Sequence, residues 1–174
     1  MLAFFFVLLA IGVRLDPHHI MAFTPVGASL LYFGARGPRK LAFIPLTLFA
    51  ATDVYLTVFY YKYPFSADHY VTWAWYAAIL LLGTLLSRSI GPLQVIGASL
   101  ATAFSFFLMS NFAVWAVWPD YPKSVAGLME CYTMALPFFR TEIVSDVLFS
   151  AVFFGLPALA GMLASRRADQ GVAA

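Results

Sequence analysis

The sequence predicts an all-α protein, a polytopic transmembrane bundle of six spans, or seven if one further segment also crosses. Hydrophobic residues make up 63% of the 174 residues and charged residues only 10%, whereas soluble domains carry about 25% charged residues. Most charges lie at the breaks between apolar runs. We therefore expect lipid to be the solvent, with residues 1–165 forming one transmembrane domain and residues 166–174 a short cytoplasmic tail.

Six apolar segments are separated by charges, proline and glycine: residues 2–13, 19–35, 41–61, 70–87, 93–118 and 143–164. A span needs about 20 mostly apolar residues, with a range of about 17–25, and the last five segments, of 17 to 26 residues, are close to this length. The first is shorter. We interpret it as a retained helix, because no basic residue precedes it and no small-residue cleavage site follows. In the second, Pro25 predicts a kink and Gly27 a smooth helix face.

Residues 123–140 lie between the fifth and last segments and are too short to span by themselves. Val125, Leu128, Met129 and Tyr132 recur at helical spacing, and Pro137 ends the pattern. We predict a short helix on the outer membrane surface. The alternative is the start of a seventh, tilted span.

The basic residues predict the orientation of the bundle. With six spans, one side collects Arg36, Arg39, Lys40, Arg88, Arg166 and Arg167, and the other collects Arg14, Lys62, Lys123 and Arg140 together with most of the acids. Because cytoplasmic loops are enriched in Lys and Arg, the first side is predicted to be cytoplasmic. We expect both termini in the cytoplasm and the chain in a bacterial inner membrane.

Three polar side chains fall inside predicted spans on different segments: Asp53, Asn111 and Asp146. Such groups are costly in lipid and must face protein or a cavity. They either line a binding site or hold helices together through hydrogen bonds. For Asp146, an ion pair with Arg140 at the interface is a further alternative.

Aromatic residues are concentrated on the predicted outer side, beyond what a symmetric interfacial belt would place there. Rings offer stacking area, and a few polar groups fix a ligand's orientation. We predict a site for a small, ring-bearing solute in the outer half of the bundle. Its predicted lining residues are Thr24, Asp53, Asn111, Trp115, Tyr132 and Asp146.

Other chemistries find little support in the sequence. His18 and His19 are weak metal-ligand candidates that Glu130 and Cys131 could complete, so no metal site is predicted, and no cofactor is indicated. The sequence shows no spacing typical of a catalytic nucleophile and its base, so we predict that the chain is not an enzyme. The net charge of +2 gives no basic patch for nucleic acid. No phosphate-binding loop is present, so uptake would need an energising partner.

Several blocks of the sequence carry a resemblance to a known family. They are residues 23–28 (Phe-Thr-Pro-Val-Gly-Ala), Thr52-Asp53, residues 110–115 (Ser-Asn-Phe-Ala-Val-Trp), residues 121–128, and residues 131–140 with their Pro-Phe-Phe motif. The chain resembles small bacterial membrane proteins described as transport proteins. That family is similar to the substrate-binding (S) components of energy-coupling factor (ECF) importers.

The resemblance implies a six-helix protein that binds a vitamin-sized ligand from outside and docks on an energising transporter module. Membrane lipid, that module and a small-molecule ligand are the implied partners. S components typically carry an Ala-xxx-Ala pair in the first helix for docking, and residues 2–13 have none. An accessory structural subunit of a larger membrane complex is therefore the alternative function.

Overall fold

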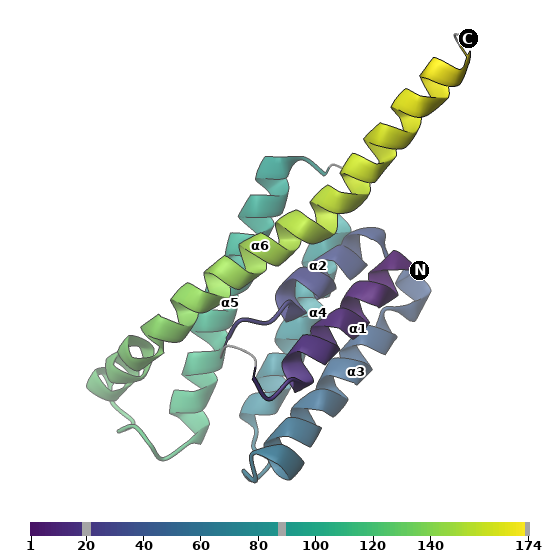
Figure 1. Ribbon diagram of the computed structural model, residues 1–174. Coiled ribbons are helices and arrows are strands. Elements are labelled where there is room, and N and C mark those ends of the chain that lie inside the picture. Colours follow the sequence, from purple (N-terminus) through teal and green to yellow (C-terminus); the bar gives the residue numbers. More distant parts are fainter. Residues whose placement is uncertain (19–21, 87–89, 173–174) are drawn as a thin grey trace.

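The computed structural model describes residues 1–18, 22–86 and 90–172, and these contain helices and no strand (Figure 1). The main helices are α1 (Leu2–Leu15), α2 (Val26–Arg36), α3 (Phe43–Val54), α4 (Asp68–Leu86), α5 (Pro92–Val117) and α6 (Val125–Val172). A short 3-10 turn, η1 (Arg39–Leu41), precedes α3, and a π-helical segment, η2 (Tyr55–Tyr60), follows it. The predicted all-α class is confirmed for the described residues.

Four helical stretches among the described residues are long and apolar enough to cross a membrane: Arg39–Tyr60, Asp68–Leu86, Pro92–Val117 and Val125–Arg166. The predicted six spans are not confirmed. With a rise of about 1.5 Å per residue, the 14 residues of α1 and the 11 of α2 fall short of a hydrocarbon core of about 30 Å. Many large apolar side chains on the longer helices are exposed, as lipid contact requires.

The predicted kink at Pro25 is wrong, because Pro25 caps the start of α2 instead of interrupting a longer helix. Proline lacks a backbone N–H, and the first N–H groups of a helix have no intrahelical partner, so proline is well tolerated there. Of the predicted second span, residues 26–35 belong to α2, and the described residues 22–25 precede it. His19 and the rest of residues 19–21 lie outside the described residues.

The prediction of a separate surface helix over residues 123–140 is wrong, because residues 125–140 form the start of α6. The structure shows one continuous helix of 48 residues that passes through Pro137 and Pro157. A proline in a helix removes one hydrogen bond and bends the axis, but packing on neighbouring helices can carry the helix through it. The C-terminal end of α6 extends beyond the other helices (Figure 1). Residues 166–172, the predicted tail, continue this helix.

α2 forms the centre of the bundle and contacts α1, α4, α5 and α6. All its residues from Val26 to Ala35 are buried, which is typical of a short core helix. Leu30, Leu31 and Phe33 supply much of the core volume. Phe6 of α1 stacks on Phe153 of α6 with 4.0 Å between the ring centroids, and this contact links α1 to α6.

Two glycines allow α2 and α4 to cross at close range. A Cβ atom on Gly34 would overlap the backbone oxygen of Leu80, and one on Gly83 would overlap that of Leu31. Close backbone approach through small residues is a common packing device between membrane helices. This crossing positions the middle of α4, and with it the residues of the candidate site.

Candidate functional site

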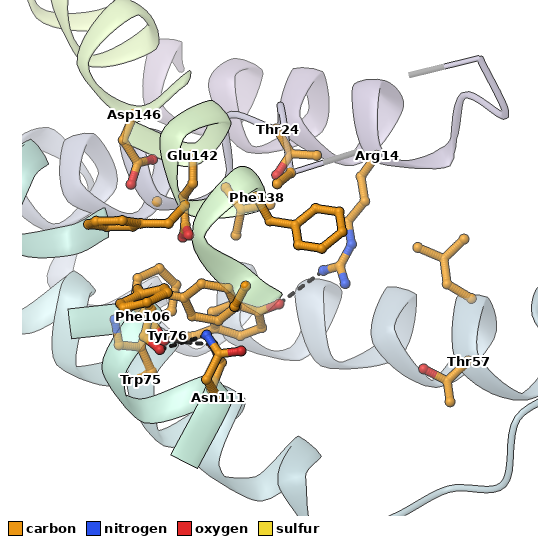
Figure 2. Close-up of a pocket in the computed structure, with 18 of the residues that line it drawn as sticks. Arg14, Thr24, Thr57, Trp75, Tyr76, Phe106, Asn111, Phe138, Glu142 and Asp146 are labelled. Carbon is orange, nitrogen blue, oxygen red and sulfur yellow. Dashed lines mark hydrogen bonds between the residues drawn. The ribbon is translucent and has the colours of Figure 1, made fainter. Parts of the chain in front are cut away.

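A cavity of about 370 Å³ lies between the start of α2, η2, α4, α5 and α6 (Figure 2). Small-molecule sites in proteins typically measure about 300–1,000 Å³. Nineteen residues line it: Arg14, Ala22, Thr24, Val26, Gly27, Leu56, Thr57, Tyr61, Trp75, Tyr76, Phe106, Phe107, Ser110, Asn111, Ala135, Phe138, Phe139, Glu142 and Asp146. The cavity is thus large enough for a molecule with one or two rings.

Aromatic side chains form much of the cavity lining. The rings of Trp75 and Phe106 lie 4.6 Å apart, and Phe107 stacks on Phe139 at 4.4 Å. The indole N–H of Trp75 donates to Ser105 Oγ at 2.9 Å, which holds the ring in place. These contacts tie α4, α5 and α6 together and leave ring faces and edges for a ligand.

A buried polar network lies at the edge of the cavity and connects α1, α3 and α4. Arg14 forms an ion pair with Asp53 and donates a hydrogen bond to Tyr76 Oη at 2.9 Å. Tyr76 Oη in turn donates to Asp53 Oδ1 at 3.1 Å, and Trp73 Nε1 donates to Asp53 Oδ2 at 2.9 Å. Asp53 is only 4% exposed and its charge is matched by Arg14. The network therefore holds α1, α3 and α4 together. Two of its members, Arg14 and Tyr76, also line the cavity.

Two carboxylates on α6, Glu142 and Asp146, face the same cavity one helical turn apart (Figure 2). Asp146 is 3% exposed, and its Oδ2 has no hydrogen-bond partner among the described residues. The backbone amide of Ala28, in the first turn of α2, interacts with this carboxylate. Helix N-termini favour negative charge, so α2 positions Asp146 without neutralising it.

The start of α2 packs closely against Asp146. A Cβ atom on Gly27 would lie 2.6 Å from Asp146 Oδ1 and 2.7 Å from Thr102 Cγ2. The Ser145 hydroxyl donates to the Thr24 carbonyl oxygen at 2.9 Å and joins α6 to the segment before α2. Glycine at position 27 is thus required for the carboxylate to approach the helix.

The structure brings three of the six predicted site residues to the cavity: Thr24, Asn111 and Asp146. Asn111 donates from Nδ2 to the Phe107 carbonyl oxygen at 2.8 Å within its own helix. No pair between Asp146 and Arg140 is present among the described ion pairs.

The other three predicted residues do not line the cavity. Asp53 is occupied by the buried network described above. Trp115 donates from Nε1 to the Pro122 carbonyl oxygen at 2.9 Å and so holds the connection between α5 and α6. Tyr132 donates from Oη to the Leu108 carbonyl oxygen at 2.7 Å, a contact between the same two helices.

Several cavity residues escaped the sequence analysis, above all Arg14 and Glu142. Each lies one residue outside a predicted apolar segment, Arg14 after residues 2–13 and Glu142 before residues 143–164. The four-residue spacing of Glu142 and Asp146 was the available signal, because it puts both acids on one helix face if the helix starts early enough. For Trp75 and Tyr76, the sequence offers no signal beyond the general excess of aromatic residues on the predicted outer side.

Irregular backbone accompanies the cavity on two sides. The π-helical segment η2 and its end contribute Leu56, Thr57 and Tyr61 to the lining. Ala22, also on the lining, has φ of 62°, a left-handed conformation that is uncommon for a residue with a Cβ atom. π-segments and unusual φ values often occur at functional sites.

Of the weak metal candidates, the structure describes His18, Glu130 and Cys131, and these belong to no group of three or more possible metal ligands. His18 is exposed and its backbone N–H donates to Asp16 Oδ1 at 2.9 Å, while His19 lies outside the described residues. Cys131 is buried and its thiol contacts the Asn111 carbonyl oxygen at 3.4 Å. Among the described residues no group of three or more His, Cys, Asp or Glu side chains could hold a metal ion.

The fold and the cavity define a class: an all-helical protein with helices of membrane-crossing length and an aromatic, acidic cavity between them. Residues 1–168 match the model of DUF6580, a family of unknown function, and the chain belongs to that family. No curated protein and no solved structure matches the chain.

Proposed function

We propose that this chain is a membrane transport subunit that binds a small, vitamin-like solute in the cavity, in the manner of an ECF S component. The observation that carries the proposal is the cavity itself, where ring faces from α4 and α5 meet polar groups from α1, α5 and α6. Apolar lining with a few convergent polar groups is the usual composition of a small-molecule site.

The position of the cavity supports binding from outside. It is lined by η2 and by the segment before α2, at the end of the bundle where α3 ends and α4 begins (Figure 1). The basic residues Arg36, Arg39 and Lys40 lie in the connection from α2 to α3, at the opposite end of α3. Under the positive-inside rule the cavity end faces outward. Uptake from there requires a separate energising module.

Native mass spectrometry of the protein in a mild nonionic detergent tests this proposal. We expect a co-purifying small molecule whose occupancy falls in Phe106→Ala and Asn111→Ala, since both side chains line the cavity. Trp115→Phe is the matched control, because Trp115 lies on the same helix but off the cavity. Retention of the same molecule by both cavity variants would reject this site.

A second candidate, an accessory subunit of a larger membrane complex, is favoured by the far end of α6. Its residues from Ala158 to Arg166 are all exposed, and Gly155 and Gly161 have no atom near the position of a Cβ. Such an apolar helix end offers close approach to another subunit. Recovery of only lipid, together with partner subunits in fixed stoichiometry, would favour this function over solute binding.

A further inference from the structure

We propose that the cavity takes an organic cation, an arylalkyl ammonium whose charge lies against Glu142 and Asp146 and whose ring lies among the aromatic side chains. This inference rests on the proposed binding function and specifies the class of its ligand. Three features of the cavity carry it: a pair of carboxylates without a basic partner, an arginine that is already occupied, and aromatic ring faces.

Among the described residues, the acidic pair has no counter-charge. Within the described part of the chain, neither Glu142 nor Asp146 forms an ion pair with a Lys, Arg or His side chain. Asp146 is almost completely buried and its Oδ2 accepts no hydrogen bond from the described residues. Buried polar atoms in native proteins nearly always have a partner. An N–H donor that carries positive charge would supply both the missing hydrogen bond and the missing charge.

Arg14, the basic residue on the cavity lining, is not free to compensate the acids. Its guanidinium pairs with Asp53 and donates to the Tyr76 hydroxyl. Breaking that arrangement would leave Asp53 buried without its cation, which is strongly unfavourable. The cavity therefore holds two acidic side chains that no described basic residue pairs with, beside an arginine that is already paired. A cationic solute would supply the counter-charge that favours their ionised form, whereas an anionic solute would find no free basic group among the described lining residues.

The aromatic lining suits a cation as well as a ring. Cations are attracted to the faces of Trp, Tyr and Phe rings within about 6 Å of the ring centroid. Trp75, Tyr76 and Phe106 lie together on the lining, with Trp75 centred 5.8 Å from Tyr76 and 4.6 Å from Phe106. Figure 2 shows Glu142 and Asp146 on α6 together with these rings and Asn111 around the same cavity. The cavity thus offers charge and stacking to one molecule.

Calorimetric titration of the purified protein in nonionic detergent tests the inference. The probes are benzylammonium, its neutral analogue benzyl alcohol and the anion benzoate. We expect saturable binding of benzylammonium at millimolar concentrations or below, and none of benzoate. Glu142→Gln and Asp146→Asn preserve side-chain shape and should each weaken benzylammonium binding by about tenfold or more.

Glu130→Gln is the matched control, because Glu130 is an exposed acid on the same helix and its loss changes the net charge equally. We expect the Glu130→Gln variant to bind benzylammonium with the same affinity as the unmodified protein. Elution as a single peak on size exclusion, with an unchanged helical spectrum, shows that each variant is folded. Should Asp146→Asn fail this check, Glu142→Gln alone decides the outcome.

Absence of saturable benzylammonium binding, equal binding of benzyl alcohol, or an affinity unaffected by Glu142→Gln would overturn the inference. Recovery of a neutral or anionic co-purified solute would also overturn it, yet would leave the proposed binding function standing. If neither a co-purified solute nor benzylammonium binding is found, both proposals fail.

Discussion

Arg14 of α1 and Asp53 of α3 form an ion pair inside the bundle, and Tyr76 of α4 bridges them. The pair joins α1, which is too short to span a membrane, to the helical stretch Arg39–Tyr60, which is long enough to do so. Asp53 also accepts the indole N–H of Trp73, so both carboxylate oxygens are satisfied. A single aspartate in this way connects α1, α3 and α4.

Asp53→Ala is expected to destabilise the protein by about 3–5 kcal/mol, because it leaves the Arg14 charge buried without its partner. Thermal unfolding in detergent measures the effect. Asp120→Ala is the control: this exposed acid should change stability by no more than about 0.5 kcal/mol. In a double-mutant cycle with Arg14→Met, the second substitution should recover part of the loss. Strict additivity would show that the two residues are not coupled.

Gly83→Ala is expected to destabilise the crossing of α2 and α4 by about 1–3 kcal/mol or more, since its Cβ would overlap the Leu31 carbonyl oxygen. Gly97→Ala is the matched control. Gly97 is also within a helix but has no atom within 4 Å of a Cβ, so alanine should be neutral or stabilise by up to about 1 kcal/mol. Equal unfolding midpoints for the two variants would contradict this account of the crossing.

Gly27→Ala is expected to reduce solute occupancy in native mass spectra while the protein remains folded. The added Cβ would press on Asp146 Oδ1 and Thr102 Cγ2 and displace the carboxylate from the cavity. Gly155→Ala, with open space around position 155, should leave occupancy unchanged. An undiminished occupancy in Gly27→Ala would show that the position of Asp146 does not matter for binding.

The orientation of the bundle predicts opposite labelling at the two ends of the span Arg39–Tyr60. In a Cys131→Ser background, a cysteine at Ala67 should react with an impermeant thiol reagent applied to intact cells. A cysteine at Lys40 should react only after permeabilisation, because basic loops stay in the cytoplasm. Both positions are exposed in the structure, so access is set by the membrane alone. The reverse pattern would invert the predicted topology.

Much of the fold followed from local sequence. The apolar segments at 41–61, 70–87 and 93–118 correspond within a few residues to Arg39–Tyr60, Asp68–Leu86 and Pro92–Val117. Charge and proline mark such boundaries wherever a helix leaves an apolar environment. The two failures, at α2 and at the start of α6, both involve proline. A proline permits a helix start, a bend or an end, and neighbouring helices decide among these.

The sequence by itself determined that the chain is helical and apolar enough to lie in a membrane. It also determined that Asn111, Asp146 and Asp53 need polar partners within the protein. Composition and intramembrane polarity are local properties, so one sequence is enough to recognise them. Only the tertiary structure decided which partner each group has: Asp53 is paired with Arg14, whereas Asp146, beside Glu142, has no ion-pair partner among the described residues. Contacts between helices depend on crossings such as Gly34 with Gly83, and no spacing along the chain specifies which helices meet.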